Sequence, residues 1–326
     1  MAGNTATRTY IIKIKFPHVG DYVSYKPDTP SAGYNLKSAQ SGYNTDQVID
    51  TSYDPKVWKI MEVDENGNIT KLLGIGAKTV LFVGSTGYNN GVYLLNDICK
   101  SRYGNTSLGA TARSLTIEDI ESRMNSTGIA ARNGYKAGTT QYGTTITFKR
   151  YYTKYPAIYA QEKYSGINVS DVADGTQVIT GSVDATAQAK MNPNGKSGSD
   201  NIYTTLPETS ETTGPSKTNL TCTQTYYNVS QSSSYFDDSN FYNMIFGTGT
   251  YFWLASRHVL CYSSLSYARF GLSLVSSSSL RGSSLFDSDG SNYYANACVA
   301  PVVSLGSGIQ VKSGSGTTSD PYVIGK

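Results

Sequence analysis

Charged residues are scarce in this sequence of 326 residues, as are cysteine and histidine. Only 16% of the residues are charged, the net charge is +3, and lysine and arginine form nothing longer than isolated pairs. A surface for nucleic acid or acidic lipid normally needs a basic cluster, so neither partner is expected.

Long apolar runs are also absent from the sequence. No run approaches the roughly 18 to 20 apolar residues of a membrane span. The first residues, MAGNTATRTY, lack the basic and apolar regions of an export signal. We therefore predict no membrane insertion and no classical signal peptide.

Cysteine and histidine are too few to suggest a metal centre or a disulfide framework. The four cysteines, Cys99, Cys222, Cys261 and Cys298, have neither a CxxC pair nor any other metal-ligand spacing. We predict free or buried thiols, leave open whether Cys261 and Cys298 pair, and expect no metal or other cofactor.

Tyrosine and glycine are abundant by contrast. The chain holds 27 tyrosines and 32 glycines against 10 prolines, which is typical of turn-rich structure with an amphipathic aromatic surface. An apolar content of 38% is sufficient for a large core. We expect a globular α+β protein with few short helices and mostly antiparallel strands.

Hydrophobic periodicity predicts several elements. Alternating apolar residues in TYIIKIKF suggest that residues 1–16 form an N-terminal arm or edge strand. Residues 56–74 indicate two strands joined by an Asn-Gly turn, with Trp58 in the core. Helical spacing predicts one helix over about 91–103, capped by Asn90, and a second that begins after Thr116.

The middle of the chain is irregular. Residues from about 190 to 235 are rich in Gly, Pro, Ser and Thr, which predicts a long polar insertion. No internal repeat and no proline-rich linker divides the remainder. We expect one domain over residues 17–326 that carries this insertion.

Three short motifs suggest chemistry, and each has a simpler explanation. GIGAKT lacks the Walker spacing and precedes a strand. Ser256, His258 and Asp287 or Asp289 supply the residue types of a hydrolase triad, but no GxSxG elbow surrounds a serine. We therefore expect His258 at the surface or in a structural hydrogen bond. FDSDGSN lacks the glutamate that closes a calcium loop, which favours a simple turn.

The stretch of 43 residues from 258 to 300 has an unusual composition. It contains no Lys, Glu, Gln, Met or Trp, although these make up 41 of the 326 residues. A stretch of average composition would hold about five of them. These five amino acids cannot be reached by changing the adenines of an AAC codon, whereas Ser, Tyr, Asn, Asp, Gly and Arg can. The alternative is an ordinary serine-rich loop of low complexity.

The flanks of this stretch resemble a known family. YFWLASR, followed some forty residues later by APVVSL, together with GYNNGVYLLNDIC, ARSLTIEDIE and YPAIYAQEK, is similar to the variable proteins of diversity-generating retroelements in bacteria and their phages. The resemblance covers nearly the whole chain after about residue 17. It implies a C-type lectin fold of the kind shared with formylglycine-generating enzymes, in which mutagenic reverse transcription rewrites a C-terminal hypervariable region.

Two features of this sequence differ from the family's pattern. Ala300 stands before Pro301 where the family would have an arginine. The cysteine positions do not reproduce the catalytic pair of formylglycine-generating enzymes, so we expect a protein that is not an enzyme.

The resemblance implies which positions are fixed and which vary. Fixed apolar or small residues would be Val259, Cys261, Ala268, Phe270, Leu272, Val275, Leu280 and Leu285. Ligand-binding residues would be Leu260, Tyr262, Ser263, Ser264, Leu265, Ser266, Tyr267, Arg269, Ser276, Ser277, Ser279, Arg281, Ser283, Ser284, Asp287, Asp289, Ser291, Asn292, Tyr293, Tyr294 and Asn296. The mixture of Tyr with Ser, Gly and Asn is the one that antibody paratopes use.

Three classes of function follow from these observations. The first is a receptor-binding protein on a phage tail or bacterial surface, with a variable protein or glycan target and, for avidity, a homotrimer or multivalent array. The second is an enzyme related to sulfatase-modifying factors, with an activated thiol at Cys261 or Cys298. The third is a structural decoration protein of a virion. The sequence favours the first.

Overall fold

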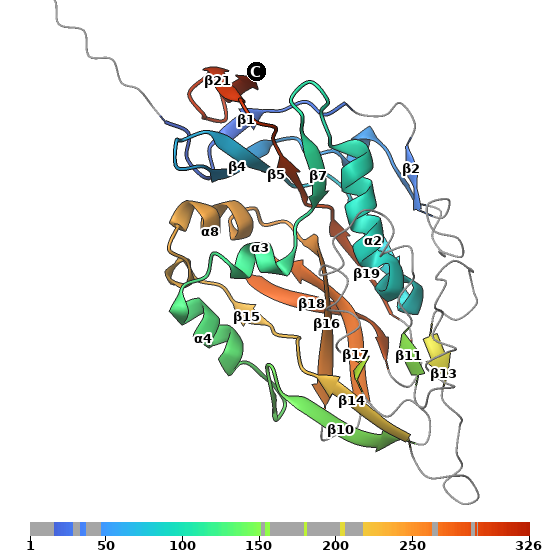
Figure 1. Cartoon of the computed structure of the whole chain (residues 1–326). Coiled ribbons are helices and arrows are strands. Elements are labelled where there is room, and N and C mark those ends of the chain that lie inside the picture. Colours follow the sequence, from blue (N-terminus) through green and yellow to red (C-terminus); the bar gives the residue numbers. More distant parts are fainter. Residues whose placement is uncertain are drawn as a thin grey trace, which may run out of the picture.

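The computed structural model describes residues 16–28, 33–36, 47–150, 154–156, 179–180, 203–205, 218–262, 267–287, 291 and 293–326. The fold is mixed α+β, with mostly antiparallel sheets, as the sequence predicts (Figure 1). Most of the predicted N-terminal arm and most of the predicted polar insertion lie outside the described residues. Within the described residues, no helix is both long and apolar enough to cross a membrane.

Two sheets form the body of the protein. The first has seven strands, in the order β21 (Gln310–Ser313), β22 (Tyr322–Gly325), β1 (Tyr22–Ser24), β4 (Trp58–Val63), β5 (Ile69–Gly74), β20 (Pro301–Ser304) and β7 (Thr111–Ser114). The second has six, in the order β15 (Val229–Ser230), β18 (Ser279–Asp287), β17 (Tyr267–Val275), β16 (Phe252–Tyr262), β19 (Tyr294–Cys298) and β6 (Thr79–Val83).

Smaller sheets and the helices surround this body. Two-stranded sheets are formed by β2 (Tyr34–Asn35) with β3 (Val48–Ile49), by β8 (Lys136–Ala137) with β9 (Thr140–Gln141), and by β11 (Lys154–Pro156) with β13 (Tyr203–Thr205). A three-stranded sheet has the order β10 (Thr145–Arg150), β14 (Thr218–Thr223) and β12 (Ile179–Thr180). The helices are α2 (Gly84–Arg102), α3 (Ile117–Glu121), α4 (Ser126–Gly134) and α8 (Ser239–Phe246), with single 3-10 turns at Thr51–Tyr53 and Ser233–Tyr235.

The predicted hairpin and the second predicted helix are confirmed. Strands β4 and β5 pair in antiparallel fashion around a turn in which Gly67 has φ +79°, and Trp58 is buried. Helix α3 begins after Thr116, whose hydroxyl accepts a hydrogen bond from the amide of Asp119. The carboxylate of Asp119 accepts the amide of Thr116 in return, which completes a capping box.

The predicted start of the first helix is wrong. Helix α2 begins at Gly84, not near Asn90, and Val83 precedes it without a side-chain cap. Gly91 stands inside this helix because the neighbouring strand leaves no room for a side chain: a Cβ on Gly91 would lie 2.3 Å from Cδ1 of Leu272. The helix therefore lies against β17 at a distance that a larger residue would prevent.

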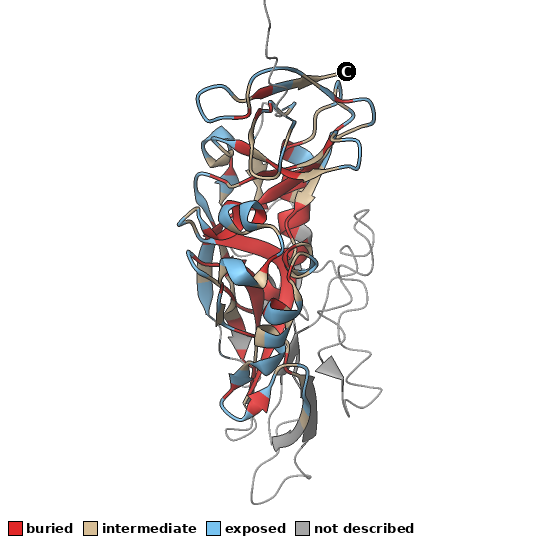
Figure 2. Cartoon of the chain, turned by 90° about the vertical axis from the view of Figure 1, so that its left-hand side faces the viewer, coloured by how far each residue is buried: buried red, intermediate tan, exposed pale blue. Residues whose placement is uncertain are grey.

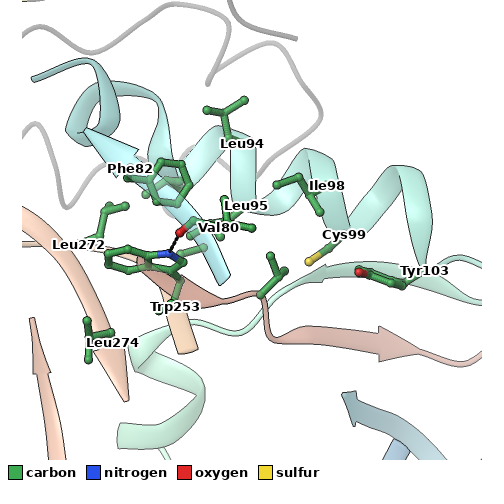
Figure 3. Close-up of a cluster of buried hydrophobic side chains, with 14 of the residues drawn as sticks. Val80, Phe82, Leu94, Leu95, Ile98, Cys99, Tyr103, Trp253, Leu272 and Leu274 are labelled. Carbon is green, nitrogen blue, oxygen red and sulfur yellow. Dashed lines mark hydrogen bonds between the residues drawn. The ribbon is translucent and has the colours of Figure 1, made fainter. Parts of the chain in front are cut away.

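One buried cluster joins both sheets to α2. It includes Trp58 of the seven-stranded sheet, Leu95 and Ile98 of α2, and Trp253 and Phe270 of the six-stranded sheet. Figure 2 shows buried residues running through both sheets. Figure 3 shows Trp253 beside Phe82 and Val80, with Leu95 of α2 next to Val80. The indole N–H of Trp253 donates a hydrogen bond of 2.9 Å to the carbonyl of Val80.

The two motifs that flank residues 258–300 are both internal. In WLASR, Trp253 is fully buried and Arg257 donates from Nε to the carbonyl of Tyr88 at 3.0 Å, which ties β16 to α2. In PVVSL, Val302 and Val303 are fully buried in β20, between β5 and β7. The stretch from 258 to 300 thus begins within β16 of the six-stranded sheet and ends directly before β20 of the seven-stranded sheet. The residues that flank it at both ends are buried in the core.

Candidate binding surface

Strand register separates the predicted fixed residues from the predicted ligand-binding ones. In the β16–β17 pair, Val259 lies opposite Phe270 and Cys261 lies opposite Ala268. Between them, Leu260 lies opposite Arg269. Because side chains alternate along a strand and directly paired residues share a face, Leu260 and Arg269 point to the face opposite these fixed residues.

The burial of the predicted fixed residues is confirmed. All of them have a relative exposure of 0%, namely Val259, Cys261, Ala268, Phe270, Leu272, Val275, Leu280 and Leu285. Together they pack into both of the buried clusters. The strands therefore keep their hydrophobic contacts whatever residues stand on the other face.

The predicted ligand-binding residues differ in exposure. Exposed to solvent are Ser277, Ser291, Tyr293, Tyr294 and Asn296. Partly buried are Tyr262, Arg269, Ser279, Arg281, Ser283 and Ser284, and buried are Leu260, Ser276 and Asp287. Ser263, Ser264, Leu265, Ser266, Asp289, Asn292 and the side chain of Tyr267 lie outside what the structure describes.

The exposed tyrosines lie where the chain returns toward β19. Tyr294 is 75% exposed and Tyr293 is 38% exposed. Along β19, exposed Tyr294 and Asn296 alternate with Ala295 and with fully buried Ala297. Strand β19 pairs with β6 in antiparallel fashion, and the amide of Gly84 donates to the carbonyl of Tyr293 at 2.7 Å. The aromatic rings thus project from a backbone that is hydrogen-bonded to the core sheet.

A polar cluster holds part of this surface in place. Nε of Arg269 lies 3.3 Å from Oδ1 of Asp287, and the hydroxyl of Tyr293 donates to Oδ2 of the same carboxylate at 2.8 Å. The guanidinium of Arg269 lies 5.6 Å from the ring centroid of Tyr293. Because Asp287 is buried and its partners are not, one carboxylate fixes two side chains that face solvent. Such fixation reduces the entropy lost on binding.

The edge of β16 at Val259 and Cys261 is covered by residues 224–226, which fall within the predicted polar insertion. The amides of Thr225 and Tyr226 donate to the carbonyl of Val259, and the side-chain oxygen of Gln224 accepts the amide of Cys261. The chain then continues to β15, which pairs with β18. Residues 224–230 therefore connect the two long edges of the β16–β17–β18 unit.

His258 occupies an environment that the sequence analysis did not foresee. Its side chain is buried, not at the surface, and neither ring nitrogen makes a well-formed hydrogen bond within the described part of the chain. The ring of Tyr226 lies 5.2 Å from the imidazole, centroid to centroid. Burial lowers the pKa of His258 to about 3, against a weaker opposite effect of the Leu272 backbone. The imidazole is therefore neutral at physiological pH.

Two strand glycines make room for this ring. A Cβ on Gly271 would lie 2.6 Å from Cε1 of His258, and a Cβ on Gly282 would lie 2.1 Å from the same atom. Glycine within a strand pattern often marks such a close approach. These glycines were the one signal in the sequence that could have indicated a buried side chain here.

We expect Gly282→Ala to lower the free energy of unfolding by about 2–3 kcal/mol, because the added methyl overlaps the imidazole of His258. Chemical denaturation of the single and double variants would measure the effect. In a His258→Ala background the same substitution should cost less than about 1 kcal/mol, because the overlap is gone. Equal costs in the two backgrounds would contradict the proposed packing.

The residues of the candidate hydrolase triad have other roles. The hydroxyl of Ser256 accepts the amide of Ile117 at 3.0 Å and donates to Glu118 at 3.2 Å, so it anchors the start of α3. Asp287 is bound by Arg269 and Tyr293. Cys261 and Cys298 are both buried and unpaired, which answers the question left open by the sequence. Burial raises the pKa of the Cys298 thiol.

No protein family, curated protein or solved structure gives a significant match to this chain.

Proposed function

We propose that this protein is a ligand-binding protein, not an enzyme, whose residues 258–300 form a variable recognition surface on a C-type lectin fold. The observation that carries the proposal is the separation of residues within this stretch. Residues expected to be fixed are all buried, whereas the exposed members of the predicted ligand-binding set are Ser277, Ser291, Tyr293, Tyr294 and Asn296. A surface built in this way can change its contacts while the core is preserved.

The chemistry of the surface supports recognition of a macromolecular target. Tyr293 and Tyr294 offer large amphipathic rings, and the neighbouring serines and Asn296 offer adaptable hydrogen bonds. Arg269 and Arg281 provide cationic groups, and Asp287 balances the charge of Arg269. We propose a protein or glycan on a cell surface as the target, bound by a phage tail or a bacterial surface protein of the diversity-generating retroelement type.

The coding sequence provides the most direct test of diversification. We expect a near-repeat of the segment that encodes residues 258–300 close to the gene, together with a reverse transcriptase. Differences between the copies should be confined to adenines of the repeat and should fall in the codons of the predicted ligand-binding residues. Differences scattered over all four bases would contradict diversification and leave a serine-rich loop.

The exposed tyrosines should carry a large share of the binding energy. Labelled protein applied to a panel of bacterial cells would identify a bound strain, and titration on that strain would give an apparent Kd. Tyr293→Ala/Tyr294→Ala should weaken binding by at least about tenfold, because buried aromatic anchors commonly contribute more than about 1 kcal/mol each.

Two variants control this experiment. Val323→Ala truncates an apolar side chain that is 45% exposed on β22 of the seven-stranded sheet, so binding should be unchanged. Tyr293→Phe removes only the hydrogen bond to Asp287, so it separates loss of the ring from loss of the fixed geometry. Equal binding by the double variant and the native protein would refute the role of this surface.

A further inference from the structure

A cavity beside the seven-stranded sheet is distinct from the proposed recognition surface in the residues that line it. Its volume is about 450 Å³, which is within the range of small-molecule sites. It lies between the seven-stranded sheet and the connection from α8 to β16, and Cys298 at the end of β19 forms part of its wall. None of the predicted ligand-binding residues lines it.

The wall of this cavity combines apolar groups with positive charge. Leu73, Ile75 and Met244 supply apolar surface, and Lys56 and Lys59 supply two ammonium groups. No aspartate or glutamate is among the lining residues. Within the described part of the chain, neither lysine has an ion pair with a carboxylate.

The position of Lys59 is defined by an aromatic neighbour. Its Nζ lies 5.1 Å from the ring centroid of Tyr22, which also lines the cavity. A hydrogen bond with Thr318 and the charge of Lys59 lower the pKa of the Tyr22 hydroxyl. Thr248 and Thr250 add hydroxyl groups from the α8–β16 connection. The cavity thus has polar donors beside an apolar wall.

We propose that this cavity binds a small amphiphilic anion, with one carboxylate, sulfonate or phosphate group on an apolar body. The anionic group lies between Lys56 and Lys59, and the body packs against Leu73, Ile75 and Met244. Selectivity for an anion comes from the attraction between the ligand's charge and these two lysines, which have no carboxylate partner among the described residues. The site shares no predicted ligand-binding residue with the recognition surface, although Cys298 of the same stretch lines it.

A matched pair of fluorescent probes tests the proposal. The anionic probe is 8-anilinonaphthalene-1-sulfonate, and the neutral probe is N-phenyl-1-naphthylamine, which has the same rings without the sulfonate. We expect saturable binding of the anionic probe at one site per chain. The neutral probe should bind at least about tenfold more weakly, because it lacks the charge that the lysines attract. Equal affinities for the two probes would overturn the proposal.

Variants of the residues that line the cavity test whether the anionic probe binds there. Lys56→Met/Lys59→Met should weaken the anionic probe about tenfold and leave the neutral probe unchanged. Lys71→Met is the matched control, since Lys71 is paired with Glu62 at 2.9 Å and does not line the cavity. Thr250→Trp, which fills the cavity, should abolish binding of the anionic probe. Tyr294→Ala should have no effect.

Either of two results would overturn the assignment: unchanged binding of the anionic probe by the double lysine variant, or unchanged binding by Thr250→Trp. Circular dichroism spectra of the variants would establish that they are folded. Competition by a short alkyl carboxylate and by an alkyl phosphate would then show which anionic group the site prefers.

Discussion

Replacement of Trp253 by alanine should lower the free energy of unfolding by about 3–5 kcal/mol, which is typical when a fully buried aromatic residue is truncated. The side chain has no exposure to solvent and packs edge-on against Phe82, with ring centroids 5.4 Å apart. Its N–H also donates to the carbonyl of Val80, so the substitution breaks a contact between β16 and β6. Urea denaturation followed by circular dichroism would measure the loss.

Two further variants separate the contribution of the buried aromatic ring from that of its hydrogen bond and from that of an exposed tyrosine. Trp253→Phe should cost less than Trp253→Ala because it keeps an aromatic ring beside Phe82, but it should not be neutral because the carbonyl of Val80 loses its donor. Tyr294→Ala, at a side chain that is 75% exposed, should change stability by no more than about 0.5 kcal/mol. A cost below about 1 kcal/mol for Trp253→Ala would contradict a rigid frame beneath the recognition surface.

Much of the fold could be predicted because its signals are local. The hairpin at residues 56–74 follows from period-2 alternation around an Asn-Gly turn, and α3 follows from the capping residues Thr116 and Asp119. These two inferences need only a few neighbouring residues. The buried set within residues 258–300 was instead implied by the resemblance to the variable proteins, and its burial agrees with that expectation.

Other features could not be predicted because they depend on contacts between distant residues. The start of α2 at Gly84 has no side-chain cap to mark it, and Gly87 in its first turns packs closely against Phe82. The cover over β16 depends on hydrogen bonds from residues 224–226, which a polar composition had assigned to an insertion. The burial of Leu260 and Asp287 likewise depends on the sheet as a whole, so family position alone did not reveal which variable residues reach solvent.

Acidification should destabilise the protein through His258. Its pKa is about 6.5 in the unfolded chain and about 3 in the folded protein, where burial disfavours the charged form. Below pH 6.5 the unfolded state therefore binds a proton that the folded state does not bind, and this favours unfolding. The stability is complete above pH 6.5 and is lost as the pH falls toward 3. Between pH 7.5 and pH 5 the loss should be about 2 kcal/mol.

The measurement is a comparison of the native protein with His258→Gln at both pH values. Other groups titrate in this range, and the partly buried Glu121, whose pKa is raised by desolvation, acts in the opposite direction. They are common to both proteins, so the difference in their pH dependence isolates His258. The variant should be less stable than the native protein at pH 7.5, because glutamine does not fill the space beside Gly271 and Gly282 in the same way, but it should lose about 2 kcal/mol less on acidification. Parallel pH profiles would mean that the imidazole is solvated, and would contradict the buried, neutral histidine beneath the recognition surface.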